Sequence, residues 1–209
     1  MNASPPAWQE SNSLLAGYVE GGGPFTYITS TFNVPTITAS TSATTDIAIW
    51  DGFQNSTGSQ IIQAGVAAGS YYLVNGAYAW YAWYYDSTGG SPVESLPVTV
   101  NAGNTVTVTI YQVSGETWAL ELTNDSTGQS TSTEQIWTQT SSTAEWDVES
   151  PPTSPAASTL TSYSGAVRFS EMALIGTQSG DGEWLMSQSD GQTATPSSLT
   201  SSGFSVTDS

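Results

Sequence analysis

Gln63 is the one polar side chain in an otherwise apolar run, "IIQAGVAAG", that covers residues 61–69. On a strand, successive side chains point to opposite faces, so Gln63 would share its face with Gly65. The glycine leaves open space beside the amide. Gln63 is therefore either a packed core amide or a functional group, because a primary amide can donate a hydrogen bond to a developing negative charge and accept one from water.

A second stretch, "TAEWDVE" at residues 143–149, carries carboxylates at alternate positions: Glu145, Asp147 and Glu149. Alternation predicts that all three lie on one strand face, with apolar side chains on the other. Neighbouring carboxylates repel one another when ionised, which can raise a carboxyl pKa into the range useful for proton transfer. The alternative interpretation is an acidic face in contact with solvent.

A third stretch, "AYAWYAWYYD" at residues 77–86, is rich in aromatic side chains. Large aromatics on both strand faces fit a strand buried on both sides. They also fit a strand with one face on the core and the other binding sugar rings or peptide side chains. The alternation divides them into one set of Tyr78, Trp80 and Tyr84 and another of Tyr81, Trp83 and Tyr85.

The residue types that are missing narrow the chemistry. The chain has no His, no Cys and, besides Arg168, no Lys or Arg, which excludes Ser-His-Asp triads, Cys-His pairs, Schiff-base lysines and His/Cys zinc sites. We expect no metal and no cofactor. Carboxylates, amides and hydroxyls remain for any catalysis.

The charge balance is extreme, with 18 acidic residues and a formal net charge of −17 at pH 7. This repulsion fades in acid as the carboxylates become protonated, so we expect a protein suited to acid. The composition, rich in Ser and Thr and without Lys, also favours extracellular surroundings. A nucleic-acid partner is not expected, because phosphate contacts need Lys and Arg. No apolar stretch reaches the length of a membrane span.

Period-2 alternation recurs along the chain, for example in "TVTVTIYQ" at residues 105–112 and "TWALELT" at residues 117–123. It predicts an all-β fold: one domain over residues 1–209, with about twelve to fourteen short strands in a sandwich of two large antiparallel sheets. Residues 1–10 are expected to form a flexible arm. Residues 150–164 are expected to form a surface loop beside a cleft, with a short helix near residues 154–163.

Taken in order, these stretches resemble the glutamic peptidase family, the eqolisins. Its members carry I-L-Q-T-G, then D-A-W-Y-E-W-Y, then N-A-E-[FW]; this chain has "IIQAGV", "AYAWYAWYY" and "TAEWDVE". The stretches "ESNS…AGYV", "STFNVPT" and "IWDGF" also fit, so the resemblance covers about residues 10 to 150. It implies an acid-stable, secreted endopeptidase, insensitive to pepstatin, on a lectin-like (concanavalin-type) jelly-roll sandwich.

By the same resemblance, Gln63 matches the family's catalytic glutamine and Glu145 its catalytic glutamate. Glu145 would activate water and Gln63 would stabilise the oxyanion, which requires that Glu145 stay partly ionised in acid, helped by hydrogen bonds to its charged form. The chain departs from the family's pattern at Gln54, Tyr78 and Ala82. The residues expected to bind substrate are Trp50, Gln54, Tyr78, Trp80 and Tyr84.

Two other functions fit the residues. "EWDVE" matches the E-x-D-x-E motif of retaining glucanases, with Glu145 as nucleophile and Glu149 as acid/base, a reaction that needs the two carboxyl groups about 5 to 5.5 Å apart. That hypothesis gives Gln63 no task. A sandwich that only binds carbohydrate or protein is the non-enzymatic alternative. For the peptidase we expect protein or peptide substrates, a monomer, and neither nucleic-acid nor membrane partners.

Overall fold

The structure, a computed structural model, describes residues 8–38, 45–69, 73–74, 77–89, 93–151 and 159–209. Over these residues the chain is built of strands with one 3-10 turn, η1 (Ser87–Gly89), and the predicted all-β class is confirmed. The strands are β1 (Trp8–Asn12), β2 (Leu15–Asn33), β3 (Thr36–Ile37), β4 (Thr45–Gln54), β5 (Ile61–Gly69), β6 (Leu73–Val74), β7 (Ala77–Tyr78), β8 (Tyr81–Asp86), β9 (Glu94–Thr99), β10 (Thr105–Ser114), β11 (Thr117–Asn124), β12 (Gln129–Ile136), β13 (Thr143–Glu149), β14 (Thr159–Leu160), β15 (Tyr163–Ser164), β16 (Val167–Ser187), β17 (Thr193–Pro196) and β18 (Phe204–Asp208).

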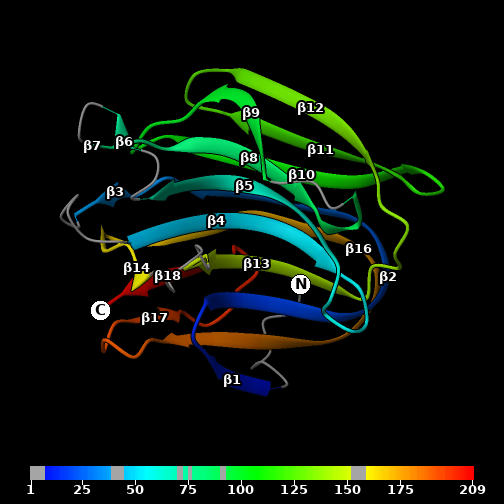
Figure 1. The fold of residues 1–209 in the computed structure, drawn as a ribbon. Helices are drawn as coiled ribbons and strands as arrows, with labels where there is room; N and C mark the ends of the chain where they lie inside the picture. The colour runs from blue at the N-terminus through cyan, green and yellow to red at the C-terminus, as the bar shows by residue number, and fades with distance from the viewer. Residues whose placement is uncertain (1–7, 39–44, 70–72, 75–76, 90–92, 152–158) are drawn as a thin grey trace.

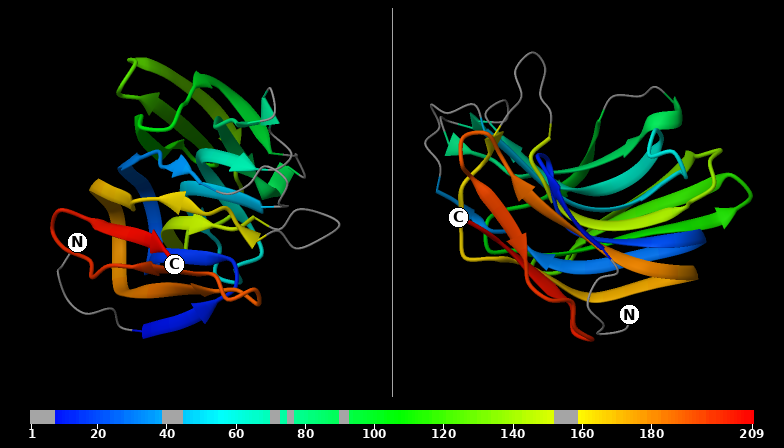
Figure 2. Two further views of the ribbon diagram at one scale, coloured as in Figure 1. Left: turned by 90° about the vertical axis from the view of Figure 1, so that its left-hand side faces the viewer. Right: turned by 90° about the horizontal axis from the view of Figure 1, so that it is seen from below.

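Two long strands, β2 and β16, join the two layers of the sandwich (Figures 1 and 2). The first part of β2, residues 15–21, pairs with β13, and its last part, residues 27–33, pairs with β10. β16 follows β2 along both parts. The main strand order is β12-β11-β10-β2-β13-β4-β5-β8-β9. The strands thus form one hydrogen-bonded sheet, which folds over to give the two layers.

The bend in β2 lies at three consecutive glycines before Pro24. Gly23 has a φ of +76°, and a Cβ there would lie 2.0 Å from the Ser141 carbonyl oxygen. Only glycine fits this backbone conformation and this close approach. The sequence therefore marks the place where one strand passes from one layer to the other.

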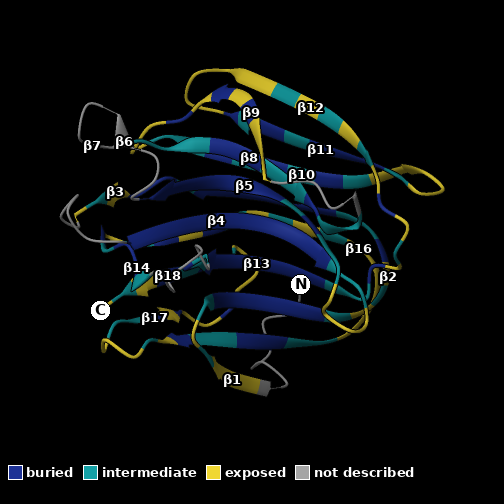
Figure 3. Ribbon diagram, in the orientation of Figure 1, coloured by how far each residue is buried: buried dark blue, intermediate teal, exposed yellow. Residues whose placement is uncertain are grey.

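The core fills the space between the layers, as the alternation predicted. β4 and β5 contribute Ile49, Ile62 and Val66, and the other layer contributes Val108 and Leu120, all fully buried. The opposite face of β4, β5 and β8 carries a second apolar cluster, separate from this core, made by Ala48, Trp50, Ala67 and Trp83. Figure 3 shows β4, β5 and β13 buried along most of their length. The second cluster is where the candidate site lies.

Two local expectations need correction. Residues 8–10, expected in a flexible arm, begin β1, which pairs in parallel with β16 from Gly182 onward. Where a short helix was expected near residues 154–163, the structure has the strand pairs of β14 with β4 and β15 with β3, while residues 154–158 lie outside the described residues. Among the helices of the described chain, none is long and apolar enough to cross a membrane.

Candidate active site

Gln63 lies on the face of β5 that points away from the main core. Its strand neighbours Ile62 and Ala64 are fully buried in that core, which confirms the predicted alternation. The Gln63 carbonyl oxygen is buried and has no hydrogen-bond partner. Gln63 also lines two cavities, one of about 380 Å³ and one of about 200 Å³. A half-buried amide whose side-chain carbonyl oxygen is buried and unpartnered beside open space is a functional candidate rather than a satisfied core group.

The strand register brings Gln63 and Glu145 into one row. Gln63 on β5 lies opposite Gly52 on β4, and Gly52 lies opposite Glu145 on β13. Two strand spacings separate the outer backbones by about 9.5 Å, and the glycine between them places no side chain in the gap. A Cβ at Gly52 would lie 2.9 Å from both the Gln63 Cβ and the Ile62 carbonyl oxygen. The long Gln63 and Glu145 side chains can therefore approach each other across Gly52.

Glu145 is buried, with 3% of its surface exposed, and is held by two donors. Thr143 Oγ1 donates to Oε1 at 3.1 Å, and Gln54 Nε2 donates to Oε2 at 3.1 Å. The pKa of Glu145 is raised to about 7, chiefly by burial and also by the charge of Glu149, against the bonds from Thr143 and Gln54, which lower it. The expectation that hydrogen bonds keep Glu145 partly ionised in acid is thus half met, because the donors are present but burial outweighs them.

The other two carboxyl groups of β13 share this face. Asp147 is fully buried, neither of its carboxyl oxygens has a hydrogen-bond partner, and burial raises its pKa well above the usual value. Glu149 accepts a 2.8 Å bond from Trp50 Nε1, and burial raises its pKa to about 7. The solvated acidic face considered as the alternative is therefore wrong. In the described chain, no group of three or more His, Cys, Asp or Glu side chains is arranged to hold a metal ion.

The glucanase alternative leaves two features of this site without a role. Asp147, the middle carboxyl group of its motif, is fully buried with both oxygens unpartnered. Gln63, which lines both cavities, has no task in that reaction.

The predicted substrate-binding residues divide between the two faces. Trp50 and Gln54 lie at the site: both line the smaller cavity, and they bond to Glu149 and Glu145. Trp80 and Tyr84 instead pack against the main core, and Tyr84 accepts a bond from Gln135 Nε2 at 3.3 Å. The side chain of Tyr78 lies outside the described part of the structure.

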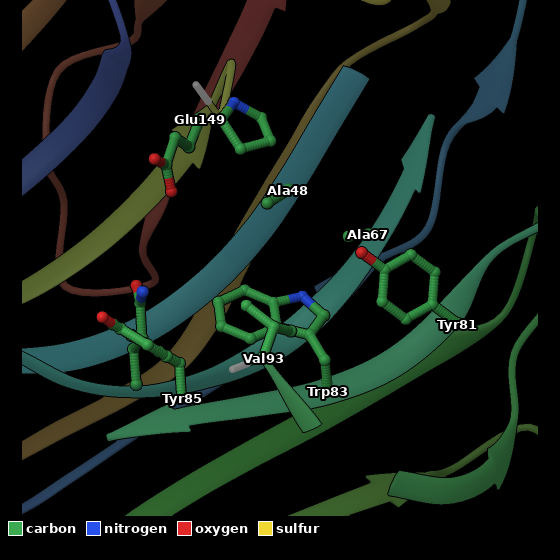
Figure 4. Close-up of a pocket in the computed structure, with 9 residues that line it drawn as sticks. Ala48, Ala67, Tyr81, Trp83, Tyr85, Val93 and Glu149 are labelled. Carbon is green, nitrogen blue, oxygen red and sulfur yellow. The ribbon is translucent and has the colours of Figure 1, made fainter. Parts of the chain in front are cut away.

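The aromatic residues that line the larger cavity are those of the opposite set: Tyr81, Trp83 and Tyr85 (Figure 4). Sequence alternation separated the two sets but could not say which faced the cleft. Pairing supplies the missing information, since Gln63 lies opposite Tyr85 and Ala64, on the core face, lies opposite Tyr84. Knowledge that β8 pairs with β5 would have identified Tyr81, Trp83 and Tyr85 as the set that faces the cavity.

Comparison with known proteins identifies the family to which the chain belongs. A model of the Peptidase A4 family matches residues 13–208. Scytalido-glutamic peptidase, solved with a transition state analog inhibitor, has a TM-score of 0.79 at 17% sequence identity, covering 94% of this chain and 98% of that chain. SCP-B, a member of the Eqolisin family in a complex with the tripeptide Ala-Ile-His, has a TM-score of 0.76 at 18% identity, with coverages of 94% and 98%.

A further similar structure is aspergilloglutamic peptidase from Aspergillus niger, with a TM-score of 0.61 at 19% identity, covering 78% of this chain and 98% of that chain. No curated protein sequence matches this chain. At these identities the structural likeness shows the β-sandwich fold.

Proposed function

Because the chain belongs to the Peptidase A4 family and is a hydrolase of the glutamic-peptidase type, we propose that it is a secreted endopeptidase that uses Gln63 and Glu145 as its catalytic pair. The observation that carries the proposal is the row Gln63–Gly52–Glu145 across three paired strands. It places an amide and a carboxyl group on either side of a residue without a side chain.

In the proposed reaction, the Glu145 carboxylate removes a proton from water as the water oxygen attacks the peptide carbonyl carbon. The carbonyl oxygen becomes an oxyanion, and the Gln63 Nε2 donates a hydrogen bond to it. Glu145 then returns the proton to the leaving nitrogen as the C–N bond breaks. The unpaired Gln63 carbonyl oxygen supplies an acceptor that can hold the attacking water.

The three carboxyl groups of β13 compete for one negative charge, because mutual repulsion disfavours a second ionisation nearby. Glu145 has two donors to its carboxylate, Glu149 has one, and Asp147 has none. These bonds favour the ionised form of Glu145 most, which supports Glu145 as the base. The pKa of Glu149 is raised to a similar value, about 7, so the two glutamates titrate together and the charge of one raises the pKa of the other.

Acidic working conditions follow from charge rather than from the dyad alone. The net charge of −17 at pH 7 falls toward zero in acid, which removes self-repulsion. Glu145, with its pKa raised to about 7, becomes more ionised as the pH rises toward neutrality. We therefore place the optimum in weak acid.

The test is cleavage of casein between pH 3 and pH 7 by the wild type, Glu145→Gln, Gln63→Ala and a matched control, Glu134→Gln. Glu134 is an exposed glutamate on β12. We expect the control to cleave like the wild type and both site variants to lose at least a hundredfold in kcat/KM, the usual loss for one oxyanion donor or one general base. Full activity in either site variant would refute the assignment. Absence of cleavage by the wild type at every pH would favour a protein that only binds.

A further inference from the structure

The larger cavity is a trough across four strands. Tyr81, Ala67, Ala48 and Glu149 form one row in register, so two alanines make the floor between a tyrosine and a carboxyl group. In Figure 4 the Trp83 indole lies between Tyr81 and Tyr85 along β8, and Glu149 lies across the alanine floor. A volume of about 380 Å³ is at the lower end of the range for ligand sites. It suits one large side chain of a peptide.

The trough contains an unused hydrogen-bond donor. Trp83 is 3% exposed, and its Nε1–H has no hydrogen-bond partner. An indole N–H only donates, and a buried donor without an acceptor destabilises the protein that contains it. The arrangement is explained if a bound group supplies the acceptor.

The lining also restricts the charge of that group. Among the described residues that line the trough there is no cation, and Glu149 is the one carboxyl group. Burial raises the pKa of Glu149 to about 7, so this carboxyl group is neutral in acid. A charged side chain would therefore enter without a partner of opposite sign, which is unfavourable in a site screened from water.

We propose that this trough is a substrate subsite beside the scissile bond and that it selects a tyrosyl side chain, whose hydroxyl oxygen accepts a hydrogen bond from Trp83 Nε1–H. The ring would lie over Ala48 and Ala67 against the aromatic residues of β8. The hydroxyl hydrogen has an acceptor in the same lining, the carboxyl group of Glu149. The inference rests on the proposed function, because Gln63 borders both the trough and the reacting bond.

A site built to bond a hydroxyl group discriminates against the same ring without it, because the buried donor is then left unpaired. We expect the wild type to favour Tyr over Phe about tenfold in kcat/KM, which corresponds to about 1.4 kcal/mol. Trp83→Phe keeps an aromatic ring and removes the donor. In this variant we expect the ratio to fall to about one, chiefly through slower cleavage of the Tyr substrate.

The experiment uses peptides of one sequence that carry Tyr, Phe or 4-methylphenylalanine on either side of the cleaved bond. The methyl group has nearly the size of the hydroxyl group but cannot accept a hydrogen bond, so the comparison separates fit from bonding within the wild-type protein. This arm does not depend on the folding of the Trp83 variant.

Equal cleavage of the Tyr and 4-methylphenylalanine peptides by the wild type would overturn the subsite and leave the dyad standing. An unchanged Tyr preference in a folded Trp83→Phe variant would also overturn it. Failure of the wild type to cleave any of the peptides would overturn the subsite together with the proposed function.

Discussion

Asp147 is the group whose replacement tests most directly how burial controls this protein. It lies on β13 between Trp50 of β4 and Gly17 of β2, and it is fully buried with both oxygens unpartnered. Burial raises its pKa above the ordinary 3.8, and the charges of Glu145 and Glu149 on its own strand and of Asp51 on β4 act in the same direction. The folded state therefore holds a proton that the unfolded state releases in weak acid.

The sign and size of the effect follow from proton linkage. Below pH 3.8 both states are protonated and the free energy of unfolding keeps its full value. Above it, each pH unit lowers that free energy by about 1.4 kcal/mol for as long as the folded carboxyl group stays protonated. From pH 4.5 to pH 6 the loss from Asp147 is about 2 kcal/mol, a large share of the roughly 5 to 15 kcal/mol that keeps a domain folded.

Asp147→Asn removes this titration while keeping the shape of the side chain. The amide N–H groups also lack partners, which costs about 1 to 3 kcal/mol at every pH. The expected result is therefore a change of slope rather than an absolute gain. Relative to the wild type, the free energy of unfolding of the variant rises by about 1.4 kcal/mol per pH unit between pH 4.5 and pH 6.

Urea unfolding followed by tryptophan fluorescence at pH 4.5, 5, 5.5 and 6 measures both slopes. Asp125→Asn removes one exposed carboxyl group from the turn after β11 and serves as the control for net charge. Parallel curves for Asp147→Asn and the wild type would refute the reasoning. A slope change of equal size in Asp125→Asn would assign the effect to overall repulsion instead of burial.

Three further substitutions test the site. Glu149→Gln removes a charge that raises the pKa of Glu145, so the acid limb of the pH profile of kcat/KM is expected to move to lower pH. An unmoved limb would show that the charge of Glu149 does not act on the catalytic base. Gln54→Leu removes a donor to Glu145 and is expected to move the same limb to higher pH, and a shift to lower pH would contradict the assigned base. Gly52→Ala places a Cβ 2.9 Å from Gln63, so we expect at least a tenfold loss of kcat/KM and about 1 to 3 kcal/mol less stability in urea; wild-type activity would show that the Gln63–Glu145 approach tolerates a side chain between them.

Much of the fold could be predicted because local alternation decides which face of a strand is buried. It placed Ile62 and Ala64 toward the core, and Trp146 on the face opposite Glu145. Alternation could not decide whether Tyr84 or Tyr85 faces the larger cavity, because both faces of β8 carry large aromatic side chains. The pairing of β8 with β5 determines which face lines the cavity.

The rest of the site depends on contacts distant in sequence. Gly52 lies between Gln63 and Glu145 only because β4 is inserted between β5 and β13, an order that sequence proximity does not reveal. The burial of Asp147 depends on strands β2 and β4, which flank β13. Without those neighbours, the alternating carboxylates of β13 equally well predict a face in contact with solvent. Likewise, the strand at residues 8–10 exists through pairing with β16, at the other end of the chain.

The carboxyl groups of this sheet impose opposite demands on pH. Glu145 must lose its proton to act as a base, and burial raises its pKa to about 7, so acid lowers the active fraction. Asp147 and Asp51 must keep their protons for the fold to stay stable, since burial raises the pKa of each well above the ordinary value. A rising pH therefore activates the proposed dyad while it weakens the sheet that holds it. The activity window is bounded by catalysis on its acid side and by folding on its alkaline side, so Asp147→Asn should extend the alkaline side and Glu149→Gln the acid side.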